Sequence, residues 1–375
     1  MTVVFDAALR ARAGSNRLPE RRRILFPFLV SKLENHSPRL LFKVMGGPVI
    51  GMGQVIRSVE LARTLPGAGF EVAGFVCNDD ACTRAIVAAI GHRVWNDTAE
   101  FSAALRETNP DVLLLDHPGP HHPVCVEART ICPDLTLVAL DCFEMEHADF
   151  DLIINLINHH PTLKAPLSTA VDYHEGPAFA IIRREFAAHR DQPRRPAGTT
   201  PKILVTFGGS DPMRHTLRVL EALASVMEKL QLTVVVGPNF PHRAEVHQRA
   251  TAAGVTILEN VSDMAALMLD ADLAISGGGT TMLELATLGI PALIIPQNEP
   301  ERRFSASIAA RGAVRTRPLD IAPPEIRREV LALLDDPAAC VRLSATGRQT
   351  VDGHGQARIA DLILQARARR QTARA

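Results

Sequence analysis

Several features that mark common protein classes are missing from this 375-residue sequence. Its charges balance, with 41 Lys+Arg against 41 Asp+Glu, and this excludes a general affinity for nucleic acid. No segment approaches the ~18 apolar residues that a membrane-spanning helix requires. The six cysteines form no C-x-x-C pair, so we expect reduced thiols in a cytoplasmic protein.

What is present is a regular alternation of apolar and helical stretches. Residues 54–65, 80–90, 212–229 and 279–289 have helical periodicity. Strand-like runs come in two series: "LLFKVM", "EVAGFVC", "DVLLLD", "TLVALD", "DLIINLI" and "AFAIIRR", then "KILVTFGG", "LTVVVG", "VTILEN", "DLAISGG", "PALIIP" and "AVRTR". The alternation predicts an α/β fold of two Rossmann-like, doubly wound domains that face a cleft.

The two series are separated by a polar stretch with three prolines, residues 187–201, which predicts a linker. We expect an acceptor or sugar domain over 38–186 and a nucleotide-binding domain over 202–375. Residues 1–37 are interpreted as an N-terminal extension with at most peripheral membrane contact, because their apolar run is short and contains a proline.

A D-x-D sequence at Asp149-Phe150-Asp151 has the form of a metal site in some glycosyltransferases. The second series contains the same arrangement at Asp270-Ala271-Asp272, again just before a buried strand. This echo favours a structural role at the start of the strand. We therefore expect neither a metal nor another cofactor.

Three glycine-rich turns lie between a strand and a helix, where backbone N–H groups can bind an anion. The second turn also offers Ser210 or Asp211 as a helix cap. Glu284 lies one turn into the last helix and could accept hydrogen bonds from the ribose of a nucleotide. The residues of these turns are Gly51, Gly53 and Gln54 in the first, Gly208 and Gly209 in the second, and Gly277, Gly278, Gly279, Thr280 and Thr281 in the third. The third turn lacks both the lysine of a Walker A loop and the G-x-G-x-x-G pattern, which disfavours ATPases and dehydrogenases.

Two further polar residues, Asp116 and His117, end a strand at the carboxyl edge of the first predicted sheet. A histidine beside an aspartate at this edge is a candidate general base. A structural role for the histidine is the alternative.

Taken together, these motifs resemble the UDP-sugar hydrolase family of the pseudaminic acid pathway and its relatives in surface-polysaccharide synthesis. The resemblance covers residues 40–364 and includes "GMGQVIRSVELA", "EGPAFAIIRREF", "FGGSDP", "DADLAISGGGTTMLELATLGIP" and "VDGHGQARI". Wider relatives are GT-B glycosyltransferases, including family 28. The resemblance implies a UDP-linked nucleotide sugar, with the base near Val261, the diphosphate on Gly277 to Thr281 and the ribose on Glu284. Arg57 and Asn298 are the remaining candidate residues for binding the nucleotide sugar.

The sequence departs from the hydrolases where their chemistry is expected. Their G-x-G-H motif carries the catalytic histidine, and here that position is Gln54. Pro118 stands where the family has a tyrosine, and the family's Asn-Gln pair reads Asn298-Glu299. An amide cannot act as a general base near neutral pH.

Three hypotheses follow. The first is a glycosyltransferase whose unidentified acceptor is activated by Asp116, His117 or His121. The second is a hydrolase whose base has moved to His117. The third is a protein that binds nucleotide sugars without catalysis.

Overall fold

The computed structural model describes residues 36–47, 52–141, 149–156, 171–193, 198–237 and 239–374. Two compact units divide the chain, residues 1–37 and residues 38–375. The predicted N-terminal extension, apart from its last two residues, lies outside the described residues. Both sheets belong to the second unit.

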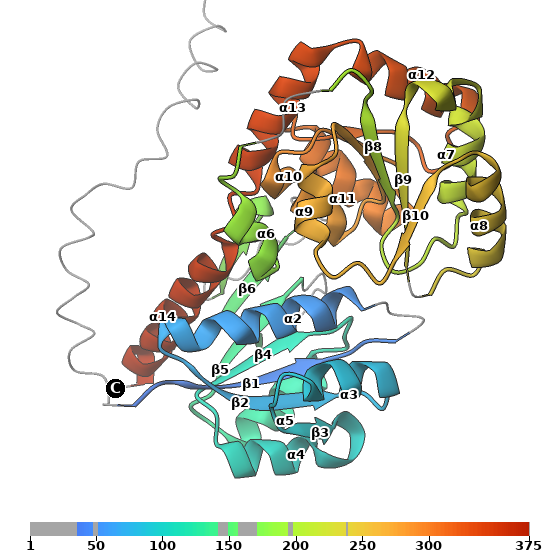
Figure 1. Ribbon diagram of the computed structural model, residues 1–375. Coiled ribbons are helices and arrows are strands. Elements are labelled where there is room, and N and C mark those ends of the chain that lie inside the picture. Colours follow the sequence, from blue (N-terminus) through green and yellow to red (C-terminus); the bar gives the residue numbers. More distant parts are fainter. Residues whose placement is uncertain are drawn as a thin grey trace, which may run out of the picture. The chain divides into compact units, whose positions relative to one another are not determined.

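The first sheet has seven parallel strands in the order β3-β2-β1-β4-β5-β6-β7 (Figure 1). The strands are β1 (Arg39–Val44), β2 (Glu71–Cys77), β3 (Val94–Asn96), β4 (Val112–Asp116), β5 (Thr136–Leu140), β6 (Leu152–Asn155) and β7 (Asp172–Glu175). The helices that follow its strands are α2 (Gly53–Thr64), α3 (Ala81–Ala88), α4 (Asp97–Thr108) and α5 (His122–Ile131). The strand order reverses between β1 and β4, which makes this pair the switch point of the sheet.

The second sheet has six parallel strands in the order β10-β9-β8-β11-β12-β13. The strands are β8 (Lys202–Thr206), β9 (Gln231–Val236), β10 (Thr256–Glu259), β11 (Leu273–Ser276), β12 (Ala292–Ile294) and β13 (Arg315–Thr316). Its helices are α7 (His215–Leu223), α8 (Arg243–Ala252), α9 (Met264–Leu269), α10 (Thr280–Leu288), α11 (Glu299–Ala309), α12 (Pro323–Leu334) and α13 (Pro337–Thr350). Here the switch point lies between β8 and β11.

The two parallel sheets that the sequence predicts are confirmed. Their strands are visible as apolar runs because both faces of each sheet are buried. In β1, Leu40 and Phe42 pack into one cluster with Val55 and Val59 of α2, while Leu41 packs into the cluster on the opposite face. Such burial leaves no polar face, so the runs are continuous.

One predicted strand is wrong. The run "AFAIIRR", 178–184, contains the end of a short 3-10 helix (Pro177–Phe179), an extended stretch and the first residue of α6 (Arg184–His189). The run is apolar because it passes between two cores. Ile181 packs into the core of the first sheet, and Ile182 packs into a core of the second. The strands β3 and β7, which have no such apolar run, were not predicted.

The predicted domain over 202–375 is wrong at its end. The last helix, α14 (Gly355–Arg374), returns to the first sheet and packs beside α2 (Figure 1). Its side chains Ile359 and Ile363 belong to the same buried cluster as Leu40 and Phe42 of β1. The sequence of α14 is mostly polar and has no pronounced apolar face, so it gives no signal of the core that this helix covers.

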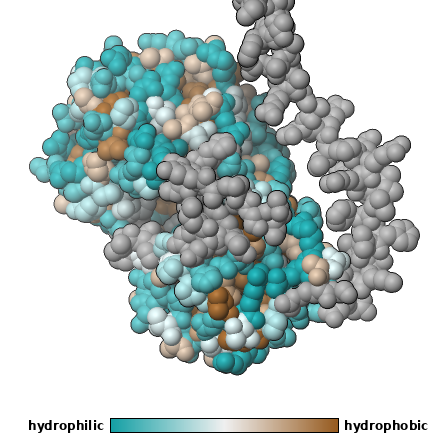
Figure 2. Space-filling model, turned by 180° about the vertical axis from the view of Figure 1, so that it is seen from behind, coloured by the Kyte–Doolittle hydropathy of each residue, from teal (hydrophilic) through white to brown (hydrophobic). Residues whose placement is uncertain are grey.

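The space-filling view of one face shows mainly hydrophilic residues, with apolar residues in small separate groups (Figure 2). Large apolar side chains with substantial exposure come from different elements, including Ile56 of α2 and Val341 of α13. Across the described ranges, no helix combines the length and apolar character that crossing a membrane requires.

The return of α14 gives a testable prediction for stability. Replacing the fully buried Ile363 with alanine leaves a cavity in the first core, so Ile363→Ala should lower the free energy of unfolding by about 2–5 kcal/mol. The adjacent Leu364 is 37% exposed, and Leu364→Ala should change it by about 0.5 kcal/mol or less. Urea unfolding measures both. Equal, small effects would contradict the packing of this helix.

Candidate functional site

Two of the predicted glycine-rich turns meet at the switch point of the second sheet. Gly208 and Gly209 follow β8, and residues 277–279 follow the neighbouring strand β11. A Cβ atom built on Gly208 would lie 4.0 Å from Oγ1 of Thr281, so the two turns are adjacent. The carboxyl ends of strands at a switch point are where open α/β sheets bind ligands.

The two turns differ in what their helix N-termini offer. At α7, Asp211 accepts hydrogen bonds from the N–H groups of His215 at 2.8 Å and Thr216 at 2.7 Å. It thus binds first-turn N–H groups as predicted, although the cap position itself is Arg214. At α10 the cap position is Gly279, without a side-chain cap, and the first turn contains no acidic residue. The N-terminus of α10 therefore presents N–H groups suited to an anion, whereas two N–H groups at the start of α7 are already bonded to Asp211.

The predicted anion cradle over Gly277 to Thr281 needs one correction. Oε2 of Glu301 accepts a hydrogen bond from the Gly278 N–H at 2.9 Å, and it also accepts one from the Gln297 N–H at 2.9 Å. The carboxylate reaches the turn because α11 begins beside it. A Cβ atom on Gly278 would lie 2.8 Å from the Glu301 carbonyl oxygen. The Gly278 N–H is thus occupied, and Gly279, Thr280 and Thr281 remain for an anion.

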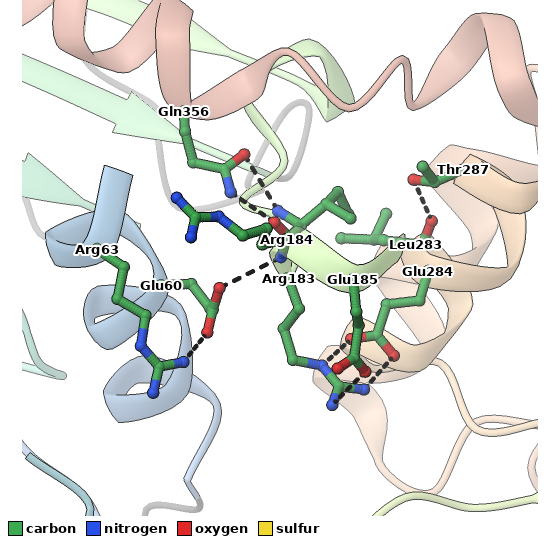
Figure 3. A network of polar contacts seen from close by, with 10 residues as sticks. Glu60, Arg63, Arg183, Arg184, Glu185, Leu283, Glu284, Thr287 and Gln356 are labelled. Atoms are coloured by element: carbon green, nitrogen blue, oxygen red, sulfur yellow. Dashed lines mark hydrogen bonds and ion pairs between the residues drawn. The ribbon is translucent and has the colours of Figure 1, made fainter. Parts of the chain in front are cut away.

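Glu284 lies in α10, below this N-terminus, and is only 5% exposed. Its two oxygens accept hydrogen bonds from Arg183, at 2.7 Å from Nε and at 3.1 Å from Nη2 (Figure 3). Burial raises the pKa of Glu284, and the Arg183 guanidinium opposes this rise. The sequence motif "IIRREF" contains Arg183, but its pairing with a residue 101 positions away has no local sequence signal.

Two other residues predicted to bind the nucleotide sugar have structural roles near this turn. Asn298 caps α11, where its Oδ1 accepts a hydrogen bond from the Glu301 N–H at 2.9 Å. Val261 follows β10, and its half-buried side chain packs against the core that contains Leu283 of α10. Both residues lie on the second sheet's side of the site.

At the first sheet, the glycine-rich turn leads into α2 with its N-terminus uncapped. Gly53 is the first helical residue, and its first turn contains no acidic residue. Among the residues described around it, which begin at Met52, no side chain caps the helix. Gly51 lies outside the described residues. The Oε1 atom of Gln54 is buried and has no hydrogen-bond partner within the described part of the chain. It is therefore an acceptor that a ligand or a water could satisfy.

Asp116 and Arg57, predicted as a base and as a ligand, are instead bound to each other. Arg57 Nε donates to Asp116 Oδ2 at 2.7 Å, and its two terminal nitrogens donate to Asp116 and Asp141. Ser58 donates a further hydrogen bond to Asp116 at 2.8 Å. Asp116 is fully buried. The pair joins α2 to the end of β4, and it corrects the predicted role of Asp116 as a base, because this carboxylate is fully buried and accepts three hydrogen bonds from protein groups. The role of Arg57 as a ligand-binding residue stays a prediction.

His117 is also unsuited to the predicted role of general base. Its Nδ1 accepts a hydrogen bond from the Gly119 N–H at 3.1 Å, which places the ring proton on Nε2. Burial, with the neighbouring His121 and Lys43, lowers the pKa of His117 to about 3. The ring is neutral at pH 7 and carries its proton on Nε2, which is buried without a hydrogen-bond partner in the described residues.

The D-x-D aspartates are engaged in structural contacts, as the sequence echo predicts. Asp151 accepts a hydrogen bond from the Leu137 N–H at 2.8 Å, as Asp272 does from the Lys202 N–H at 2.8 Å. Each carboxylate therefore anchors the start of a neighbouring strand. Asp149 is bonded to His122 at 2.6 Å.

Residues 203–303 match the glycosyltransferase family 28 C-terminal domain. This segment runs from β8 into α11 and contains both glycine-rich turns of the second sheet, the uncapped N-terminus of α10 and Glu284.

Three relatives are similar over longer stretches. An uncharacterized protein of Methanocaldococcus jannaschii is 29% identical over 68% of this chain and 55% of its own length. The spore coat polysaccharide biosynthesis protein SpsG of Bacillus subtilis is 26% identical, over 85% of this chain and 95% of SpsG. A UDP-N-acetylglucosamine--N-acetylmuramyl-(pentapeptide) pyrophosphoryl-undecaprenol N-acetylglucosamine transferase of Acidiphilium cryptum is 30% identical, over 50% of this chain and 54% of the enzyme. The chain thus spans about half the length of the first and third of these relatives.

Solved structures with the same fold include MurG of Acinetobacter baumannii, with a TM-score of 0.64 and 14% identity over 88% of this chain and 99% of MurG. A putative UDP-N-acetylglucosamine 2-epimerase of Listeria monocytogenes aligns with a TM-score of 0.58 and 14% identity, over 86% of this chain and 95% of the epimerase. HepE of Anabaena, solved with UDP and glucose, aligns with a TM-score of 0.59 and 14% identity, over 87% of this chain and 99% of HepE. These likenesses confirm the predicted fold, which is that of GT-B glycosyltransferases such as MurG.

The buried state of His117 predicts how stability changes with pH. Its pKa falls from the model-peptide value of 6.5 to about 3 on folding, so between these values the unfolded chain binds the extra proton. Stability should therefore rise with pH in this window, and the histidine should account for a loss of about 2 kcal/mol between pH 7 and pH 5.

Urea unfolding of the wild type and of His117→Gln at both pH values measures this loss, because glutamine does not titrate. The same substitution at the exposed His354 is the control. An unchanged pH dependence in His117→Gln would contradict a buried neutral ring.

Proposed function

We propose that this chain is a GT-B glycosyltransferase that transfers a sugar from a UDP-sugar to an acceptor in the synthesis of a surface glycan or a related glycoconjugate. The observation that carries the proposal is the uncapped N-terminus of α10 at a switch point, within the segment that matches the family 28 domain. The proposal of a glycan product is supported by SpsG, a spore coat polysaccharide biosynthesis protein, and that of a UDP-linked donor by the Acidiphilium N-acetylglucosamine transferase.

In the proposed complex, the diphosphate accepts hydrogen bonds from the N–H groups of Gly279, Thr280 and Thr281. The ribose hydroxyls donate to Glu284, and the uracil lies near Val261. Two buried polar atoms without partners in the described residues, Oγ of Ser276 and Oε1 of Gln297, lie beside the same turn and would complete the polar lining.

The transfer itself breaks the bond between the anomeric carbon and the UDP oxygen, which keeps the electron pair, and forms a bond between that carbon and the acceptor oxygen, whose proton passes to the leaving diphosphate or to solvent. The dipole of α10 stabilises the negative charge that develops on the leaving diphosphate. We propose that this replaces a metal, since the D-x-D carboxylates are already bonded to protein groups. Gln54 would orient the sugar or the acceptor, because its amide cannot take the acceptor's proton.

The finer resemblance to the pseudaminic-acid-pathway hydrolases supports a second candidate, a UDP-sugar hydrolase. That chemistry needs a base for water, and the low pKa of His117 argues against the relocated base that we considered. The low pKa of His117 and the bonded state of Asp116 argue equally against these two residues as the group that activates the acceptor of a transferase. A protein that binds nucleotide sugars without turnover is the remaining alternative.

We also propose a cytoplasmic setting, where UDP-sugars are synthesised. Its support is that the thiols of Cys77 and Cys132 are buried, and burial raises the pKa of both. Such thiols stay protonated and unreactive. Any peripheral membrane contact would involve residues 1–37, which lie mostly outside the described residues.

The proposal predicts which product appears from a panel of nucleotide sugars. With water as the sole acceptor, the full chain should release UDP far more slowly than on the order of 1 s⁻¹, an ordinary enzymatic rate. Adding lipid-linked or soluble glycan acceptors should produce UDP and a glycosylated product in equal amounts. Release of free sugar at enzymatic rates without acceptor would contradict the transferase and favour the hydrolase. Binding of UDP without turnover on any acceptor would favour the third hypothesis.

A further inference from the structure

Residues 182–184, between the two sheets in sequence, are hydrogen-bonded on three sides (Figure 3). Gln356 of α14 donates to the Ile182 carbonyl at 2.5 Å and accepts from the Ile182 N–H at 3.4 Å. Glu60 of α2 accepts a hydrogen bond from the Arg184 N–H at 3.3 Å. The Arg183 side chain points the other way, toward Glu284 of α10. The backbone that carries this arginine is therefore fixed.

We propose that Arg183 is a positioning residue that holds the Glu284 carboxylate in one orientation, and in its charged form, for hydrogen bonds from the ribose. This inference rests on the proposed function, which places the ribose on Glu284. It adds a residue that the sequence did not single out, and it assigns to that residue a role through another side chain.

The guanidinium is itself held in place. It lies over the ring of Phe186 with 4.6 Å between the guanidinium carbon and the ring centroid, and Nη1 is 3.1 Å from Glu185. Two parallel hydrogen bonds to Glu284 then fix the plane of the carboxylate. Each carboxylate oxygen accepts one of them, so each keeps a second lone pair for a ribose hydroxyl.

The surroundings of Glu284 would otherwise favour its neutral form. The carboxyl is buried, and the negative charges of Glu185 of α6 and Glu60 of α2 raise its pKa further. From α13, Arg348 lies at the far end of α10, where it donates to the Leu288 carbonyl. Arg183 provides the hydrogen bonds and the positive charge that lower the pKa of Glu284. A protonated Glu284 could still accept hydrogen bonds, but without the strength that its charge adds.

The test measures how strongly the protein distinguishes UDP from its 2′,3′-dideoxy analogue. Both probes carry the same base and diphosphate, so the ratio of their dissociation constants isolates the ribose hydroxyls. Titration calorimetry of the full chain at about pH 6 and about pH 8.5 should give a wild-type ratio of about tenfold or more at both values.

In Arg183→Met the ratio should fall toward one, and it should fall further at the lower pH than at the higher pH, because loss of the guanidinium raises the pKa of Glu284 further. Arg183→Lys keeps the charge without the paired geometry and should give an intermediate ratio. Arg184→Met removes the neighbouring guanidinium while keeping the backbone hydrogen bond to Glu60, and it should match the wild type.

A wild-type ratio in Arg183→Met at both pH values, with Glu284→Ala reducing the ratio, would overturn the inference and leave the proposed ribose site standing. A wild-type ratio in Glu284→Ala would overturn both. If Arg183→Met does not fold, Arg183→Lys decides, since a wild-type ratio there shows that the paired hydrogen bonds are not needed.

Discussion

The arrangement of this protein depends on two stretches of chain that pass between its cores side by side, residues 180–184 and the start of α14. A Cβ atom on Gly355 would lie 2.1 Å from the Ala180 carbonyl oxygen, so only glycine permits the approach. The next residue, Gln356, then satisfies both the N–H and the carbonyl of the buried Ile182. Buried backbone groups require partners, and here one side chain provides them. The motif "GHGQ" therefore has a structural explanation, which is to hold the two passages together.

This junction also connects the two candidate halves of the site. The backbone of Arg184 is bonded to Glu60 of α2, the helix whose first turn carries Gln54. The side chain of Arg183 is bonded to Glu284 of α10, the helix whose N-terminus is open to a diphosphate. A ligand that binds Glu284 therefore contacts the partner of Arg183, and the backbone beside Arg183 is hydrogen-bonded to α2. The structure offers a short physical route between nucleotide binding and the turn that we expect beside the sugar.

The fold could be predicted from the sequence because buried parallel strands and amphipathic helices have local patterns. A sequence pattern is misleading where two different structures produce it, as with an apolar run that can be either a buried strand or a segment between two cores. Residues 178–184 are apolar because they lie between two cores, and not because they form a strand. In the candidate site, the glycine-rich turns and the hydrogen bonds of Asp211 at the start of α7 followed from short-range rules. The pairing of Arg57 with Asp116, 59 positions apart, and the contact of Glu301 with the third turn depend on tertiary packing, which no short window of sequence contains.

The central proposal is that a nucleotide binds at the open end of α10 and at Glu284, which Arg183 connects to the junction. Amide hydrogen exchange of the full chain with and without saturating UDP tests this claim most directly, because it reports on every segment at once. The account predicts slower exchange in residues 279–288 and in residues 181–184 when UDP is bound. Slower exchange confined to the switch point of the first sheet, or no change in residues 279–288, would contradict it.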